Sequence, residues 1–569
     1  MRKYITVTTP LLCILLSACD RSEIPATEQN NAEAQLCAAQ KAVMVDDIGN
    51  YGRDIHSSSP EAQAYFDQGL RLTYSYYFPE ALASFDAALC FDQNNPMIQW
   101  GRALAIAPNP NSRYGAVTDD PVGAGWEAIQ TAQRLAEADT KSSPADKELI
   151  NALAVIFDKS TNTDQVARSA AFIEATQALY AQHPQDLEAA FLAADAIMMA
   201  TPWQYFSQQD GSPINLADKA QAIIETGIAQ NPLHPGLNHL HIHLMENSFT
   251  PEQAESSADR LESLTPKAGH MVHMPGHIYM RVGRYADSIS TNQRSLEADE
   301  YFAGVWGDIP FPTGVTYGLS HRGHSGHARN FIHWGAVLAG NSEMALDTAK
   351  LMVDGLNEQR LQSGGGQRTL AMYWMTLRFF RKWQDILQIT LPENPPPYIE
   401  GIFHFVQGSA YIATGNAEAA SQSLATLKSI AAQPDLENQR AAVNTVKDLL
   451  TIAVNELGGE VANANGNFVE AINYFQQAVN AQDSLRYMEP PDWLQSTRLV
   501  LGNAYLDAEL YAEAEAVFRR DLTFLHENGW ALYGLLQSLQ AQQQEEEIVT
   551  VEQRFGNAWQ YADVDLGSL

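Results

Sequence analysis

A pattern of small and large side chains, found near both ends of the chain, constrains the fold more than any other feature. Near the start it is formed by Gly69, Leu72, Ala81, Phe85 and Ala88. The same offsets of 0, 3, 12, 16 and 19 recur in Gly502, Tyr505, Ala514, Phe518 and Asp521. Small residues let two helices approach closely, and the large residues fill the space between them. The pattern predicts antiparallel helix pairs that stack into an array, whose core grows with chain length.

This pattern resembles the consensus of tetratricopeptide repeats, which have a period of about 34 residues. The same register predicts repeats that begin at Pro235, Gly269 and Gly326, and looser helical pairs at 401–434 and 459–492. In the last of these, Gly466 is assigned to the small position of the first helix. We find no convincing alternation of polar and apolar residues that would indicate a strand. The sequence therefore predicts an all-α fold, a tetratricopeptide-repeat helical solenoid (superhelix) with inserted loops.

The repeats divide the chain into regions. Residues 36–230 are predicted to form an N-terminal tetratricopeptide-like helical region, residues 231–360 a histidine-rich core, and residues 361–569 a C-terminal tetratricopeptide-like region. The starts at Gly269 and Gly326 are 57 residues apart, which is 23 more than one repeat. Because residues 300–325 are rich in glycine and aromatic side chains, we expect an inserted loop there.

The first residues indicate export to a membrane. Residues 1–18 have a basic start and an apolar stretch, and they end in Leu16-Ser17-Ala18 before Cys19. This order resembles a bacterial lipoprotein signal, which implies that residues 1–18 are removed and that Cys19 carries a lipid. An ordinary cleaved secretory signal is the alternative. Residues 19–35 are polar without an apolar period and are predicted to be a flexible tether.

The lipoprotein resemblance implies a place in the bacterial cell envelope, anchored to the inner or the outer membrane and facing the periplasm. In that oxidising compartment Cys37 and Cys90 could pair or remain free buried thiols. The chain has 35 Lys and Arg against 67 Asp and Glu, a formal net charge of −32. Because such a charge repels phosphate, we expect no nucleic-acid partner.

Histidine is concentrated in the middle of the chain, where 11 of the 15 lie between residues 234 and 333. His239 and His243 are four residues apart, as are His273 and His277, and 34 residues separate the two pairs. All four take positions 5 and 9 in the first helix of adjacent repeats. These positions resemble the concave, ligand-facing ones of known tetratricopeptide domains. Side chains four apart on a helix are neighbours, so the four imidazoles are predicted to converge on one patch of a groove.

Three more polar residues are predicted to face the same side. His270 and His327 take position 2 of their repeats, and Glu246 takes position 12. Neutral imidazoles with a nearby carboxylate suit zinc, copper, iron or nickel, so these residues and the two histidine pairs are candidate ligands of one transition metal. Two alternatives stay open: a metal-free groove for an acidic or aromatic ligand, and purely structural histidines.

The other histidines of this region are predicted to have different roles. His241 lies between the members of one pair and is predicted to point into the packing. His234 precedes Pro235 and is predicted to be a helix cap or a partner of a metal ligand. His321 and His324 belong to the predicted loop and could close over the groove.

Six segments resemble a family of bacterial tetratricopeptide-repeat lipoproteins with little assigned chemistry. They are FDQGLRL (66–72), WGRALAIAPNPN (100–111), HPGLNHLHIHLMENS (234–248), AGHMVHMPGHIYMRVGRY (268–285), YMEPPDWLQSTRLVLGNAYL (487–506) and DLTFLHENGWALYGLLQSL (521–539). They span almost the whole chain after Cys19. The resemblance implies a tetratricopeptide fold with a histidine-rich groove.

The chain departs from this family in two places. Tyr77-Phe78-Pro79 stands where relatives commonly have a histidine, and Asn330 stands where they have the second histidine of an HNxHF motif. Asn330 is therefore a candidate groove residue rather than a metal ligand. The C-terminal segments add five residues that would either line the same groove or pack in a core: Tyr487, Glu489, Trp493, Arg498 and Trp530.

Together these features predict a lipid-anchored solenoid that binds a peptide, protein or small-molecule ligand in a histidine-rich groove containing a transition metal. One alternative is a metal-dependent enzyme, a hydrolase or an oxidoreductase, in which the same histidines hold a catalytic ion and Glu246 is a general base or ligand. Another is a metal-free scaffold for peptides or proteins. The sequence contains no HExxH, GxSxG or GxxxxGK[ST], so no motif supports hydrolysis.

Overall fold

The computed structural model describes residues 42–111, 118–161, 163–307 and 321–568, which are predominantly helical. These ranges contain no strand, only two isolated bridges that join Phe206 to Pro213 and Arg440 to Thr445. Within the same ranges, no helix is both long enough and apolar enough to span a membrane. The predicted signal 1–18, Cys19, the tether 19–35 and Cys37 lie outside the described residues.

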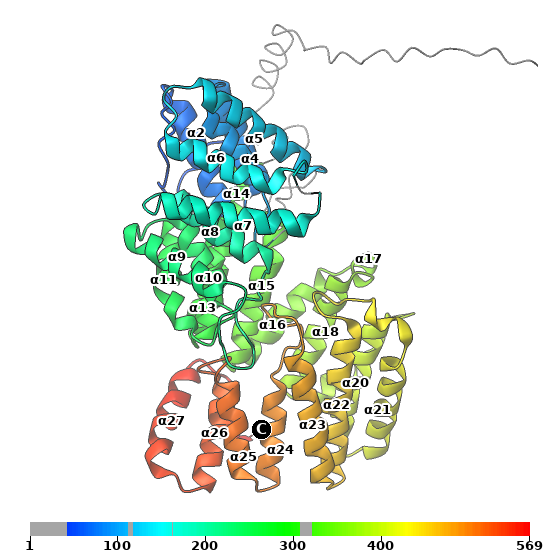
Figure 1. Ribbon diagram of the computed structural model, residues 1–569. Coiled ribbons are helices and arrows are strands. Elements are labelled where there is room, and N and C mark those ends of the chain that lie inside the picture. The colour runs from blue at the N-terminus through cyan, green and yellow to red at the C-terminus, as the bar shows by residue number, and fades with distance from the viewer. Residues whose placement is uncertain (1–41, 112–117, 162, 308–320, 569) are drawn as a thin grey trace, which may run out of the picture.

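Antiparallel helix pairs follow one another along the chain (Figure 1). The N-terminal pairs are α2 (Pro60–Tyr74) with α3 (Phe78–Phe91), α4 (Pro96–Ile106) with α5 (Pro121–Ala138), α6 (Pro144–Phe157) with α7 (Gln165–Gln182), and α8 (Leu187–Ala200) with α9 (Ala217–Gln230). The central pairs are α10 (Pro235–Met245) with α11 (Glu255–Leu264), α12 (Gly269–His273) and α13 (Pro275–Arg281) with α14 (Tyr285–Trp306), and α15 (His321–Leu338) with α16 (Ser342–Asp354).

The C-terminal pairs continue the series. They are α18 (Gly364–Phe379) with α19 (Trp383–Leu387), α20 (Pro397–Ala413) with α21 (Ala417–Ala431), α22 (Val446–Ala464) with α23 (Phe468–Asp483), α24 (Thr497–Asp507) with α25 (Tyr511–Asp521), and α26 (Gly529–Ala541) with α27 (Glu545–Ala558). Short helices between or after them are η1 (Pro251–Ala254), α17 (Glu358–Leu361), η2 (Pro434–Glu437) and η3 (Leu566–Ser568). The fold is thus an all-α tetratricopeptide-like solenoid, as predicted.

Close contacts between glycine and phenylalanine explain why the repeat pattern produces these pairs. A Cβ atom at Gly69 would lie 2.7 Å from the Phe85 ring, and one at Gly101 in the next repeat would lie 2.5 Å from the same ring. Gly502 and Gly534 hold Phe518 in the same way, with distances of 2.4 and 2.2 Å. Each phenylalanine therefore fills the space that two glycines of successive repeats leave open, and a larger residue at these glycines would separate the helices.

One predicted register was wrong. Gly466 was assigned to the small position of a repeat at 459–492, but it lies in the turn between α22 and α23 with a φ of +76°. Glycine adopts this left-handed conformation without steric cost. The small position belongs to Gly459, whose Cβ would lie 2.5 Å from the Phe475 ring. This repeat therefore begins seven residues earlier than predicted.

The predicted inserted loop at 300–325 is also corrected. Helix α14 continues to Trp306, and α15 already begins at His321. Phe302 and Trp306 are four residues apart on α14 and are buried in the N-terminal core, where Phe302 packs against Tyr77 at 4.8 Å between ring centres. Burial of these two aromatic rings explains why the helix extends into the sequence assigned to the loop. Residues 308–320 lie outside the described part of the chain.

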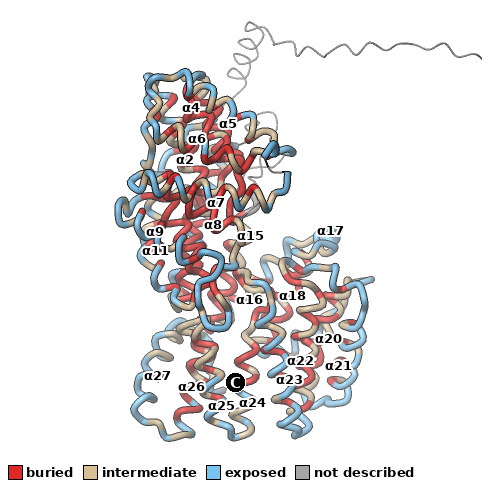
Figure 2. The backbone as a smooth tube through the Cα atoms, in the orientation of Figure 1, coloured by how far each residue is buried: buried red, intermediate tan, exposed pale blue. Residues whose placement is uncertain are grey.

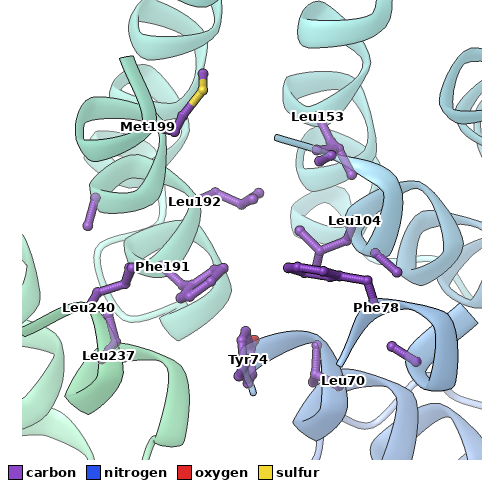
Figure 3. Close-up of a cluster of buried hydrophobic side chains, with 14 of the residues drawn as sticks. Leu70, Tyr74, Phe78, Leu104, Leu153, Phe191, Leu192, Met199, Leu237 and Leu240 are labelled. Carbon is purple, nitrogen blue, oxygen red and sulfur yellow. The ribbon is translucent and has the colours of Figure 1, made fainter. Parts of the chain in front are cut away.

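Two large hydrophobic cores run through the molecule. The first extends from α2 to α14, and the second joins residues from α13 to α23 with Trp493 and Leu494. Figure 2 shows the buried backbone inside each set of stacked helices. Figure 3 shows the first core where α2, α8 and α10 meet around Tyr74, Phe191 and Leu237. Contacts between α10 and residues far away in the sequence fix the position of this histidine-bearing helix.

The C-terminal repeats return to the central ones. In Figure 1, α26 and α27 lie next to the end of the molecule that carries α13. The Arg281 guanidinium at the end of α13 donates a 2.8 Å hydrogen bond to the Phe524 carbonyl oxygen, and the Trp530 indole donates one of 3.0 Å to the Val337 carbonyl oxygen. The superhelix is therefore closed by contacts between residues about 190 to 240 apart in sequence. This return places residues 487–493 against the central repeats.

Candidate metal centre

The two predicted histidine pairs lie side by side on neighbouring helices. His239 and His243 are on α10, whereas His273 ends α12 and His277 lies on α13. Ring centres are 4.7 Å apart in the first pair and 4.8 Å apart in the second. The ring centres of His243 and His277, one from each pair, are 6.2 Å apart. The pairs thus converge, as their spacing predicts.

His270 joins the first pair to form what we call the first trio, His239, His243 and His270. The Nε2 atoms of His270 and His239 are 3.2 Å apart. One ring nitrogen from each of the three side chains lies within 4.8 Å of the others. His239 and His243 are almost completely buried. The first trio therefore brings three imidazole nitrogens to one point in the interior.

His327 joins the second pair to form the second trio, His273, His277 and His327. The Nε2 atoms of His273 and His277 are 3.0 Å apart, and the His327 ring centre lies 4.7 Å from that of His273. These three also offer ring nitrogens within 4.8 Å of one another. His327 is carried by α15, so three helical segments build the second trio.

The outward-facing nitrogens of the rings have hydrogen-bond acceptors. His239 Nδ1 lies 2.7 Å from the Tyr74 carbonyl oxygen. His273 Nδ1 lies 2.6 Å from Asn292 Oδ1, and the amide nitrogen of Asn292 donates elsewhere. Because these oxygens only accept, each Nδ1 carries the hydrogen. The Nε2 atoms of His239 and His273 therefore present lone pairs to the interior of the cluster when the rings are neutral.

Two carboxylates hold the rings from the other side. His277 Nδ1 lies 2.9 Å from Glu489 Oε2 and 2.6 Å from Glu246 Oε2. Glu246 Oε1 lies 3.3 Å from His243 Nδ1 and also accepts a hydrogen bond from the Trp203 indole. Glu246 thus contacts one ring of each trio at Nδ1, the nitrogen that faces away from the Nε2 pairs. It orients imidazoles in this arrangement, and with His277 and Glu489 it also forms a third group that could hold a metal ion, so its prediction as a metal ligand stays open.

Burial controls the protonation of the cluster. Removal from water, followed by repulsion from neighbouring imidazoles, lowers the pKa of His239, His270, His273 and His327 well below the usual value. These four rings are therefore neutral at physiological pH. Neutral imidazole is the form that binds a metal ion.

His277 differs from the other members of the cluster. Burial lowers its pKa, but the charges and hydrogen bonds of Glu246 and Glu489 outweigh burial and raise the pKa to about 10. The ring is then an imidazolium, and it can donate its Nε2 hydrogen to His273 at 3.0 Å. A positive charge is thus required between these two nitrogens, and either a proton or a metal ion can supply it.

Most of the cluster is buried and only His270 and His327 are half-buried, whereas a concave, ligand-facing groove was predicted. Tyr76, from the turn between α2 and α3, covers the first trio, with its ring centre 4.5 Å from His239 and 5.4 Å from His270. The Tyr487 hydroxyl donates to the Glu246 carbonyl oxygen at 3.1 Å on another side. The physical reason is the closure of the superhelix, which covers the concave face with residues from both ends of the chain.

The remaining histidines of the region fall into two groups. His241 bonds Ser257 at 2.9 Å, away from the trios, and His234 caps α10 by accepting from the Leu237 amide at 3.1 Å. Both places agree with the predictions. His324 lies on α15 with its ring centre 5.4 Å from His270 and 5.0 Å from His273, so it belongs to the cluster rather than to a loop. Its Nδ1 bonds Asp299 at 2.9 Å, and its buried Nε2 has no hydrogen-bond partner.

The five candidate residues from the C-terminal segments line one cavity of about 210 Å³ beside the cluster. They are Tyr487, Glu489, Trp493, Arg498 and Trp530. Glu489 belongs to both places, because it lines the cavity and contacts His277. Trp493 and Trp530 also pack in hydrophobic cores. Asn330 is not among the lining residues, although its side-chain oxygen is buried without a partner.

Several residues of the cluster were missed from the sequence. His324 precedes His327 by three residues, which is a helical spacing, but the surrounding glycines favoured a loop. Asn292 occupies position 24 of its repeat, where a large apolar residue is expected. A polar residue at this position could have identified Asn292 as a partner of the histidines. Tyr76 is held at a positive φ of 59° in a turn, and no local pattern identifies it as a neighbour of His239.

Comparisons with known proteins add little to this geometry. No family model matches the chain, and no curated protein matches its sequence. The human IFIT1 dimer with m7Gppp-AAAA is 10% identical, covers 96% of this chain and 97% of its own, and has a TM-score of 0.32. Cut9–Hcn1 of the APC/C is 12% identical, covers 88% of this chain and 94% of its own, and has a TM-score of 0.24. Naa15/Naa10 bound to HypK-THB is 10% identical, covers 88% and 89%, and has a TM-score of 0.22.

These scores carry no argument for a shared ligand or partner. The IFIT1 structure contains a nucleic-acid ligand. That ligand is a property of IFIT1 and does not decide whether the present chain binds nucleic acid. For the present chain, the absence of a nucleic-acid partner stays a prediction from its net charge of −32.

Proposed function

We propose that this chain is a transition-metal-binding helical-repeat protein whose buried histidine cluster holds the metal. The observation that carries the proposal is the orientation of the rings. His239 and His273 direct Nδ1 at acceptor oxygens, at 2.7 and 2.6 Å, and direct Nε2 at another imidazole. Histidines that bind metals almost always donate their other ring hydrogen to a carbonyl or carboxylate in this way.

The spacing of the rings supports the proposal. An ion bound to three imidazoles at about 2.0–2.1 Å places their ring centres roughly 5 Å apart. In the second trio, His273 lies 4.8 Å from His277 and 4.7 Å from His327 between ring centres, and the third distance is 5.9 Å. Zinc, copper, iron and nickel suit a site built from imidazoles, whereas magnesium and calcium prefer oxygen ligands.

The proposal includes the location of the protein. We place it in the bacterial cell envelope, bound to the membrane through a lipid on Cys19, because residues 1–19 resemble a lipoprotein signal. The solenoid surface would then face the periplasm and be available to peptide or protein partners. A mutation of Cys19 to Ser that releases the protein from the membrane fraction would support this location, and unchanged membrane association would contradict it.

A metal-dependent enzyme is a second candidate, and the shared position of Glu489 favours it. The same side chain contacts His277 and lines the cavity of about 210 Å³. An apolar cavity of about 150 Å³ in another protein is large enough to hold benzene. A small apolar or aromatic molecule would therefore reach the edge of the cluster. Conversion of such a molecule by the metal-loaded protein, lost in a Glu489→Gln variant that retains its metal, would support an enzyme.

Elemental analysis tests the metal itself. The full chain is purified in mild detergent without a histidine tag and reconstituted separately with Zn, Cu, Fe, Ni and Mn. We expect near-stoichiometric binding of at least one of these metals, and none in a His239→Ala/His273→Ala variant that stays folded by circular dichroism. The matched control is His241→Ala/His333→Ala, because His241 bonds Ser257 and His333 bonds Thr376, both outside the trios.

The outcome decides between the candidates. Full metal content in the control, together with loss in the cluster variant, supports the metal centre. If no metal binds the wild-type chain under any of these conditions, both the metal-binding proposal and the enzyme are wrong. The buried imidazoles then belong to a metal-free scaffold for peptides or proteins.

A further inference from the structure

We infer that the histidine cluster is a paired centre that holds two transition-metal ions, one in each trio. This inference rests on the proposed function and makes it more specific. The part of the chain that the structure describes offers two groups that consist of histidine alone, His239 with His243 and His270, and His273 with His277 and His327. No residue is shared between these two groups.

A single ion does not account for all six histidines. An octahedral ion with bonds of about 2.1 Å keeps its ligand atoms within about 4.2 Å of one another. Among the described residues, sets whose ligand atoms lie within 4.8 Å of one another contain three members each, and none of them combines the two trios. The short Nε2 contacts, 3.2 Å for His239 with His270 and 3.0 Å for His273 with His277, lie within a trio. The ring nitrogens of each trio therefore converge on a separate point.

The two points on which the trios converge are nevertheless adjacent. His243 and His277 are 6.2 Å apart between ring centres, and His270 and His273 are 6.1 Å apart. Glu246 contacts Nδ1 of His243 at 3.3 Å and Nδ1 of His277 at 2.6 Å, so one carboxylate orients a ring in each trio. A change in charge at one ion would reach the other through this shared acceptor.

His324 occupies the space between the trios. Its ring centre lies 5.4 Å from His270 of the first trio and 5.0 Å from His273 of the second. Its Nε2 is buried without a hydrogen-bond partner, and so is Nε2 of His243. Asp299 holds the opposite nitrogen of His324 at 2.9 Å, the arrangement typical of a metal ligand. His324 thus places a seventh imidazole beside both trios, where its free Nε2 can contact a ligand bound between the ions.

This arrangement defines the class of ligand. Three imidazoles leave at least one coordination position open on each ion, and neighbouring open positions can take one small anion or water between them. The ions are first-row transition metals that accept nitrogen ligands. The paired centre is therefore suited to a small bridging ligand, in contrast to a structural site whose four ligands are all supplied by protein.

Separate removal of each trio tests the inference on the full chain in detergent. We expect two equivalents of copper or zinc per wild-type chain, about one in His243→Ala, about one in His327→Ala, and none in the double variant. His241→Ala is the control, because this imidazole lies on the same helix as His243 but bonds Ser257, and it should keep two equivalents. If His243→Ala does not fold, His239→Gln removes a ligand of the same trio.

Electron paramagnetic resonance of Cu(II) gives a second readout. The signal of each singly loaded variant should be that of an isolated ion, whereas the doubly loaded wild type should show a broadened or diminished signal from neighbouring ions. A wild-type content of one equivalent that either single variant abolishes would overturn the paired centre and leave the metal-binding proposal standing. A wild type without any metal would overturn both.

Discussion

Two buried polar clusters of this molecule differ in how completely their hydrogen bonds are satisfied. In the C-terminal core, Arg378 donates to Ser409 at 2.9 Å, to Gln495 at 3.1 Å and to Glu456 at 3.0 Å. Glu456 also accepts from the Trp493 indole at 2.9 Å. The buried polar atoms of Arg378, Ser409 and Glu456 all have partners, so this cluster is complete as a structural element.

The histidine cluster has too many acceptors for its donors. Nε2 of His273 faces Nε2 of His277 at 3.0 Å, and both rings direct Nδ1 at acceptor oxygens. Nε2 of His243 and of His324 have no partner at all. Because buried polar atoms without partners cost free energy, an added cation bound by these unpartnered nitrogens would stabilise the cluster. The comparison shows that the number of buried polar residues is less informative than the balance of donors and acceptors among them.

The largest expected effect concerns the satisfied cluster. Replacing Arg378 by Ala leaves Glu456 buried beside Glu460 without its cation, so we expect a loss of about 3–5 kcal/mol in the free energy of unfolding. Metal content should not change, because the two clusters are separate. Denaturant unfolding and elemental analysis of the same variant measure both quantities. A stability within 1 kcal/mol of wild type would contradict the structural role of the Arg378 cluster, and a loss of metal would contradict the separation of the two clusters.

Metal should stabilise the fold through the unsatisfied cluster. At a free metal concentration of about 100 to 1,000 times Kd, we expect a gain of about 3–4 kcal/mol, since an ion that binds only the folded state stabilises it. Thermal unfolding before and after chelation measures the gain. The His241→Ala/His333→Ala variant should keep it and the His239→Ala/His273→Ala variant should lose it. Equal stabilisation of both variants would place the ion outside the trios.

A third prediction concerns Asp195 on α8, which is buried with one carboxylate oxygen unpartnered. Burial raises its pKa to about 8. Between the unfolded pKa of about 3.9 and the folded value, the folded state binds the extra proton, so stability falls as the pH rises. We expect this residue to cost about 2–3 kcal/mol between pH 5 and pH 7, at about 1.4 kcal/mol per pH unit.

Asp195→Asn should remove that dependence, because the amide does not titrate. The difference in unfolding free energy between wild type and variant, measured at pH 5 and at pH 7, isolates this one group from the other carboxylates. We expect the variant to gain relative to wild type at the higher pH. A constant difference across the two pH values would show that Asp195 titrates near its ordinary value.

The smallest effect comes from a single hydrogen bond of the satisfied cluster. Trp493→Phe keeps most of the apolar contact and removes the indole donor to Glu456, so we expect a loss of about 1–2 kcal/mol in stability. Denaturant unfolding measures the loss. Trp493 also lines the cavity. Binding of a small aromatic probe to the metal-loaded variant therefore serves as a control for the shape of the cavity. A loss above 4 kcal/mol would indicate that ring packing, rather than the hydrogen bond, dominates.

The sequence predicted the parts of this site that local periodicity controls. His239 with His243 and His273 with His277 follow from a four-residue spacing repeated after 34 residues. The helix pairs follow from glycines such as Gly69, which leave space for Phe85. These features depend on contacts within one repeat or between neighbouring repeats, so a local pattern is enough to find them.

Contacts between distant repeats could not be predicted in the same way. The burial of the cluster depends on Tyr76 from the first repeat and on Glu489, which lies 212 residues after His277. Both reach the cluster only because the superhelix closes on itself, and closure depends on the accumulated rotation of many repeats. For the same reason, the division into two trios was not visible in the spacing alone.

X-ray absorption of the metal-loaded full chain tests the central claim most directly. The account predicts nitrogen ligands at about 2.0–2.1 Å, with the outer-shell scattering of about three imidazoles per ion. The His239→Ala/His273→Ala variant should retain too little metal to give this spectrum, which would assign the imidazoles to the cluster. A spectrum dominated by oxygen ligands without imidazole scattering, or one that the variant leaves unchanged, would contradict the account.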